Sequence, residues 1–185
     1  MRSLYRDILG VSWDELDPAV QHVHLNVTPL ARFAGTFSLK AKVPRAMAIL
    51  LAAFGVRLKP NSDVAVRLVV MRHGETEIWR RFFGRRKVET IQSAGGGNTI
   101  VERMGPAELR FGLEARDGAL SYRFDSTHVG IWPFRMRLPN WLAPRGTAIE
   151  SADADGVRVE VVIAWLIAGV TLSYAGIIKA EEPTR

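Results

Sequence analysis

The sequence predicts an α+β fold that is mainly antiparallel β, with a strongly curved sheet or barrel of about ten strands and two or three short helices. Two observations carry this prediction. From residue 35 onward, apolar residues recur at every second position in run after run, which is the pattern of half-buried strands. Turn residues such as Asp117-Gly118 separate these runs and join them as hairpins. A sheet of that size curls because strands twist and flat sheets of many strands are rare.

The length and composition indicate one globular domain. A chain of 185 residues is long enough for one hydrophobic core and scarcely for two, and 48% hydrophobic with 24% charged residues is ordinary globular composition. We therefore expect a single domain over 1–185, with a helical part at 1–26 and the sheet at 35–178. The absence of cysteine excludes disulfides and thiolate zinc sites. Charges interrupt the apolar residues at the start, which argues against a secretory signal and favours the cytoplasm.

Two short helices are predicted before the sheet. Ser3 is the expected N-cap of the first, which ends before Gly10. Asp17 caps the second, Pro18 occupies its first position, and the helix ends near His24. Helices this short need tertiary contacts, so we expect both to dock on the sheet.

A third helix is predicted at 44–54, inserted in the sheet. It begins with Pro44, is apolar on all sides and stops at Gly55. A helix without a polar face is buried, so this one is expected to pack on the sheet. The predicted strands, in order, are 35–43, the two arms of a hairpin within 64–86, 88–92, 99–104, 107–115, 119–124, 129–138, 147–152, 157–165 and 170–178.

Two of these strand assignments need an argument. Pro133 interrupts 129–138, which makes that segment an edge strand or a bend. Residues 161–178 lack charge over a length that reaches a membrane helix. The alternation that begins at Val157 nevertheless continues through Ile163, so we expect two strands joined near 166–169 and no membrane span.

The hairpin 64–88 carries most of the net charge of +6, with seven basic and two acidic residues. By parity Trp79, Arg81 and Phe83 share one face, and Ile78, Arg80 and Phe82 share the other. One face must look inward, and the alternation leaves open which arginine does so. A buried guanidinium needs a carboxylate or a bound anion, and Glu102 with Arg103 is the nearest expected source of a partner.

Two interpretations of this arrangement stay open. The pair is either a structural Arg–Glu bridge or the polar floor of an apolar pocket that holds the acidic head of a ligand. The candidate ligand-binding residues are Trp79, Arg81, Phe83, Glu102, Arg103 and His24.

Signatures of catalysis and of cofactor or metal binding are missing from the sequence. It contains no dinucleotide fingerprint, phosphate loop, zinc-protease motif or nucleophile elbow. His22 and His24 are two apart and so diverge on a helix, which argues against a metal pair, and Gly95–Gly97 is interpreted as a hairpin loop. Catalytic residues stay unassigned, and neither a cofactor nor a metal is expected.

Three functions are therefore considered. The first is a binding domain for a small amphiphilic or anionic ligand in the curved sheet. The second is an enzyme whose Glu/His/Arg acid–base site uses His24 or Glu102. The third binds nucleic acid or an anionic surface through Arg80, Arg81, Arg85, Arg86 and Lys87. Nucleic acid is disfavoured because the arginines are spread over many strands.

Several short motifs resemble a known family. They are LYRDILG and WDELDPAVQHVH at the start, WRRFFGR in the hairpin, ERMGP at 102–106, RLPNWLAP at 137–144 and YAG at 174–176. In this order they resemble the bacterial family catalogued as domain of unknown function 4166, in its stand-alone form. The resemblance implies a single-domain architecture. Other members of the family are appended to a dehydrogenase-like domain, so the resemblance also implies a dehydrogenase-like partner. It implies no activity.

Overall fold

The alternating segments form strands of one antiparallel sheet. The structure, a computed structural model, describes residues 3–25, 30–44, 62–131, 134–165 and 169–181. Eleven strands lie in this part of the chain. They are β1 (Leu30–Lys42), β2 (Ser62–His73), β3 (Thr76–Phe83), β4 (Arg86–Gly96), β5 (Thr99–Met104), β6 (Ala107–Arg116), β7 (Ala119–Ile131), β8 (Phe134–Arg137), β9 (Arg145–Asp153), β10 (Gly156–Trp165) and β11 (Val170–Ala180).

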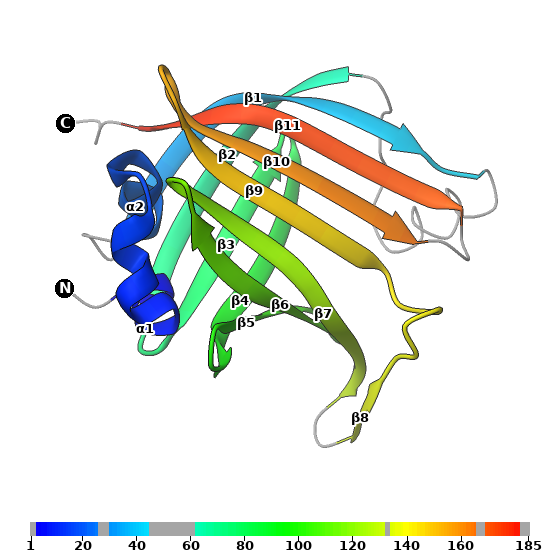
Figure 1. The fold of residues 1–185 in the computed structure, drawn as a ribbon. Coiled ribbons are helices and arrows are strands. Elements are labelled where there is room, and N and C mark those ends of the chain that lie inside the picture. The colour runs from blue at the N-terminus through cyan, green and yellow to red at the C-terminus, as the bar shows by residue number, and fades with distance from the viewer. Residues whose placement is uncertain (1–2, 26–29, 45–61, 132–133, 166–168, 182–185) are drawn as a thin grey trace.

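Ten of these strands close into a barrel (Figure 1). The order around the sheet is β6-β5-β4-β3-β2-β1-β11-β10-β9-β7, and pairing of β6 with β7 closes the ring. The long strand β7 pairs through Leu120–Arg123 with β9 and through His128–Ile131 with β8. Because β9 and β8 share one edge of β7, β8 is left outside the ring. The predicted curved, mainly antiparallel fold is confirmed, and the sheet closes.

Two glycines permit close approach between β1 and β11. A Cβ atom on Gly35 would lie 2.0 Å from the carbonyl oxygen of Ile177, and one on Gly176 would lie 2.3 Å from that of Thr36. Both distances are far inside van der Waals contact. Glycine within a strand is typical of sharp bends in barrels, because a side chain there would push the backbones apart.

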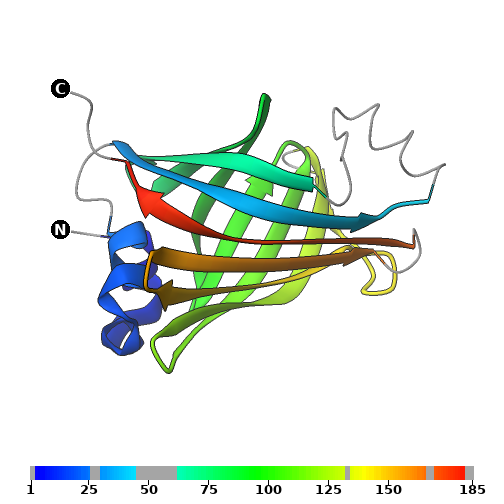
Figure 2. The same cartoon turned by 90° about the horizontal axis from the view of Figure 1, so that it is seen from above.

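The helices cover one end of the barrel (Figures 1 and 2). They are α1 (Leu4–Leu9), the 3-10 helix η1 (Gly10–Glu15) and α2 (Pro18–His24). The Ser3 hydroxyl caps α1 by accepting a hydrogen bond from the Arg6 N–H at 3.4 Å, and an Asp17 carboxylate oxygen caps α2 by accepting from the Ala19 N–H at 2.8 Å. We call residues 3–25 the helical plug. Its apolar side chains, such as Val20, belong to the same buried core as side chains of the barrel interior such as Val70 and Leu120.

Several boundaries differ from the expected ones. β1 begins at Leu30 instead of residue 35, because pairing with β2 and β11 extends it beyond its regular alternation. The segment 129–138 divides into the end of β7 and the edge strand β8. The uncharged run forms β10 and β11, as predicted, and no described helix is long and apolar enough to cross a membrane. The predicted helix 44–54 lies outside the described residues, apart from Pro44.

Candidate functional site

Strand β3 directs alternate side chains into the barrel. Trp79 stands opposite Val70 of β2 and Thr90 of β4, and all three side chains are buried. Residues of the same parity on β3, including Arg81 and Phe83, therefore face the interior. Arg80 faces outward and pairs with Glu89 at 2.6 Å.

Arg81 is a basic residue of the interior, and its partners come from neighbouring strands. Its Nη1 donates to Thr90 Oγ1 and to Glu102 Oε1, both at 2.9 Å, and its guanidinium lies 5.2 Å from the centre of the Trp79 ring. Among the described residues, its Nε and Nη2 donate to no partner. Burial alone would lower the pKa of Arg81, but the Glu102 carboxylate offsets this and the pKa lies above its ordinary value. The guanidinium is therefore charged, and its Nε and Nη2 are free to donate to a further group.

Aromatic rings line the barrel wall beside this pair. Tyr174 of β11 meets Phe83 and Phe37 edge-on, with ring centres 5.8 and 5.7 Å away. Phe111 of β6 meets Tyr122 of β7 at 6.5 Å in the same manner. These contacts form a wall of apolar ring surface with polar hydroxyl groups.

A chain of polar side chains connects the plug to the barrel. His24 Nε2 of α2 lies 2.6 Å from Glu150 Oε2 of β9, and the Tyr122 hydroxyl donates to Glu150 Oε1 at 3.1 Å. The Tyr5 hydroxyl of α1 lies 3.2 Å from that of Tyr122 and donates to Gln92 Oε1 at 2.8 Å. The ring of His24 also contacts that of Tyr5 in a tilted arrangement, with centres 3.9 Å apart. Four of the five members of this network are buried and Tyr122 is partly buried, and two of the five belong to the plug.

Burial and charge set the protonation of this network. Burial raises the pKa of Glu150, but the positive field and hydrogen bond of His24 more than offset it, so the net pKa is lowered. Burial, reinforced by the Glu150 charge, raises the pKa of Tyr5 and Tyr122. The carboxylate is therefore ionised and both phenols stay neutral at neutral pH.

Two buried polar atoms beside the network have no hydrogen-bond partner within the described part of the chain. They are Nδ1 of His24 and Oε1 of Glu77. The other carboxylate oxygen of Glu77 accepts from the Trp79 indole at 3.1 Å. Both side chains, His24 on the plug and Glu77 on β3, have no exposed surface, so neither faces bulk water.

The structure brings five of the six predicted residues into one interior. Trp79, Arg81 and Phe83 lie on the inner face of β3, and Glu102 joins them from β5. His24 lies at the plug end, where its ring centre is 5.7 Å from that of Trp79 and its Nε2 pairs with Glu150 and not with Glu102. Arg103 lies on the outer face of β5 and binds Glu108 at 3.0 Å, because adjacent residues of a strand point to opposite faces.

Sequence reasoning missed half of this interior. The candidate residues do not include Tyr5, Gln92, Tyr122, Glu150 or Tyr174. Glu150 is 126 residues from His24, so only closure of the barrel joins them. Parity within 147–152 was the one available signal, since it places a carboxylate on the face opposite Ile149.

The described residues contain no group of three or more His, Cys, Asp or Glu placed to hold a metal ion. The basic hairpin is also divided, because Arg81 faces inward while Arg85, Arg86 and Lys87 are exposed at the β3–β4 turn.

Together, fold and interior define a closed antiparallel barrel with a helical plug and a polar, aromatic-lined inside. Residues 16–178 match the family described as Domain of unknown function (DUF4166), and the chain belongs to that family. Neither a curated protein nor a solved structure matches the chain.

Proposed function

We propose that the chain is a small-molecule-binding domain that holds an amphiphilic or anionic ligand inside the barrel. One observation carries the proposal. Arg81 and Glu102 point inward, yet their side chains are 22% and 19% exposed. Tyr174 and Phe83 beside them are also only partly buried. An inward-facing group stays accessible where side chains do not fill the space around it, which is how ligand sites in barrels arise.

The contrast with the plug end supports the same conclusion. There Glu77, His24 and Leu120 have no exposed surface, so that part of the interior is closed to bulk solvent. The interior thus consists of a sealed half beneath the helices and a half that water reaches around Arg81. A ligand would occupy the second half.

The chemistry of the accessible half suggests how a ligand is held. Nε and Nη2 of Arg81 can donate to a carboxylate, phosphate or hydroxyl oxygen of a ligand head. Glu102, which already neutralises Arg81, offers an acceptor beside it. Tyr174, Phe83 and Phe111 provide ring surface for an apolar body.

The proposal is tested with two fluorescent probes of similar shape, anilinonaphthalene sulfonate, which is anionic, and phenylnaphthylamine, which is neutral. Both are expected to bind the wild type with enhanced fluorescence. Arg81→Met should weaken the sulfonate about tenfold, as loss of a charge-assisted hydrogen bond does, and the neutral probe much less. Arg123→Met, on the exposed outer face of β7, is the matched control.

A second variant separates binding from folding. Val161 stands opposite Tyr174 and so faces the interior, and Val161→Phe should fill the accessible space and weaken both probes while Arg81 is intact. Melting curves and far-ultraviolet dichroism verify that each variant is folded. If probe binding survives both Arg81→Met and Val161→Phe unchanged, the barrel interior is not the binding site.

A further inference from the structure

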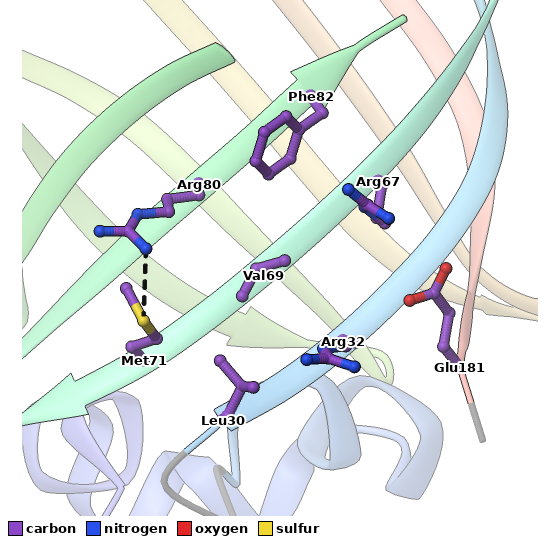
Figure 3. A pocket seen from close by; sticks show the side chains of 8 residues that line it. All are labelled: Leu30, Arg32, Arg67, Val69, Met71, Arg80, Phe82 and Glu181. Carbon is purple, nitrogen blue, oxygen red and sulfur yellow. Dashed lines mark hydrogen bonds between the residues drawn. The ribbon is translucent and has the colours of Figure 1, made fainter. Parts of the chain in front are cut away.

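A second concave surface lies on the outside of the barrel. It is a groove of about 760 Å³ over β1, β2 and β3, with the end of β11 at its far side (Figure 3). Side chains here have the opposite parity to Trp79 and Arg81, so this groove and the interior site are on opposite faces of the same strands.

Strand register explains how the groove is built. One row across β1 to β4 is apolar, with Leu30 opposite Met71, Met71 opposite Ile78, and Ile78 opposite Ile91. The solvent-facing side of an antiparallel sheet is normally polar, so four apolar residues in register are unusual on the outer face of a barrel. This row gives the groove an apolar side, and Val69 extends it into the next row.

The next two rows are basic. Arg32 stands opposite Val69, and Val69 opposite Arg80, while Arg67 stands opposite Phe82. Arg32 and Arg67 are therefore diagonal neighbours on adjacent strands, within about 8 Å of each other at Cβ. Two like charges at that spacing repel unless an anion lies between them.

In the described part of the chain, no carboxylate forms an ion pair with Arg32 or Arg67. Arg80 is bound to Glu89 at 2.6 Å, and the Arg67 guanidinium lies 5.1 Å from the centre of the Phe82 ring. Within the described residues, neither Arg32 nor Arg67 forms an ion pair or a side-chain hydrogen bond. Glu181 lines the groove, and its backbone N–H donates to the Arg32 carbonyl at 2.9 Å. The groove thus holds the guanidinium groups of Arg32, Arg67 and Arg80 and one carboxylate, that of Glu181. Arg80 is already paired with Glu89, which does not line the groove.

We propose that this groove is a second binding site, for a small amphiphilic anion whose phosphate or carboxylate head lies between Arg32 and Arg67. Its apolar body covers Val69 and Met71, and a planar body also stacks beside Phe82. The volume is within the range of small-molecule sites, roughly 300 to 1,000 Å³. The site does not depend on the barrel interior, because its residues all point outward.

Naphthyl phosphate is the test probe, with inorganic phosphate and naphthol as its two halves. Isothermal titration calorimetry should show naphthyl phosphate binding more tightly than either half, and more weakly at high salt. Arg32→Gln and Arg67→Gln should each weaken it about tenfold. Both residues are exposed, so the variants should fold like the wild type. Arg123→Gln, on the outer face of β7 away from the groove, should change nothing.

Two results would overturn the inference. One is equal affinity for naphthyl phosphate and inorganic phosphate, which would mean that the apolar row contributes nothing. The other is unchanged binding in both Arg32→Gln and Arg67→Gln. Arg81→Met distinguishes the two sites: if it abolishes naphthyl phosphate binding while Arg67→Gln does not, the probe binds inside the barrel and the outer groove is not a site.

Discussion

His24 Nε2 on α2 and Glu150 Oε2 on β9 lie 2.6 Å apart in the buried interior, and this pair fastens the helical plug to the barrel. Tyr122 donates to the second carboxylate oxygen, so both oxygens of Glu150 are satisfied. Breaking a buried pair costs more than replacing it, because one partner is left charged and alone. The stability of the plug should therefore depend on both residues together.

A double-mutant cycle measures this dependence. His24→Leu should lower the free energy of unfolding by about 3 kcal/mol, since it strands the Glu150 carboxylate in the interior. In His24→Leu combined with Glu150→Leu the stranded charge is gone, so the loss should be smaller than the sum of the two single losses by about 2 kcal/mol. Urea denaturation followed by tryptophan fluorescence reports the values. Additive losses would show that the two side chains do not interact.

Acid should loosen the same contact. The pKa of Glu150 is lowered in the folded protein, so its stabilising contribution is present above the ordinary carboxyl value of 4.5 and is lost as pH falls through the folded pKa. As the pH is lowered from neutral to below 4.5, the melting temperature of the wild type should fall more steeply than that of Glu150→Gln. Glu160→Gln, which removes an exposed carboxylate from β10, should follow the wild type. Parallel curves for wild type and Glu150→Gln would contradict the expectation.

Alkali should act through the phenols. The chain has three tyrosines, and the pKa of each is raised above 10.0, chiefly because burial disfavours the phenolate. Their contribution to stability is present below that value and is lost as pH rises above it. Phenolate absorbance of the folded protein should therefore appear at higher pH than that of the chain in guanidinium chloride, which should titrate near 10.0. A reversible titration near that value in the folded protein would refute this.

Gly176 should be intolerant of a side chain. A Cβ there would lie 2.3 Å from the Thr36 carbonyl oxygen and 2.8 Å from Cγ of Phe37, so Gly176→Ala should cost about 3 kcal/mol through overpacking. Gly112 of β6 is the matched control, because the nearest atom of the described residues to its Cβ would be the Arg123 carbonyl oxygen, at the ordinary contact distance of 3.9 Å. Gly112→Ala should change stability by less than about 0.5 kcal/mol. Similar melting temperatures for the two variants would contradict the close approach of β1 and β11.

The alternation of side chains predicted most of the fold, because period two is a local property that each strand shows separately. The shared face of Trp79, Arg81 and Phe83 follows from it directly, and so does the division of 161–178 into two strands. The same rule places Glu102 and Arg103 on opposite faces, so naming both as partners of one inward arginine conflicted with the pattern. Applied strictly, parity would have kept Glu102 alone.

The rest depends on contacts between distant segments. No local pattern indicates that His24 meets Glu150, or that Tyr5 meets Gln92 across 87 residues, because both contacts require a closed ring covered at one end. The barrel closes because β7 pairs with both β6 and β9. The hairpin signal at Asp117-Gly118 predicts the pair of β6 with β7, but no local signal predicts that β7 also pairs with β9. Polar networks inside a barrel are therefore harder to predict than its wall.

The attachment of α2 to β9 also constrains the order of folding. During synthesis the helical segment leaves the ribosome before β9, because the strand that carries Glu150 follows more than a hundred residues later. Short helices have little stability alone, so we expect residues 3–25 to wait, unfolded or bound by a chaperone, until translation reaches the ninth strand. A segment made well before β9 would then reach its final place only after that strand.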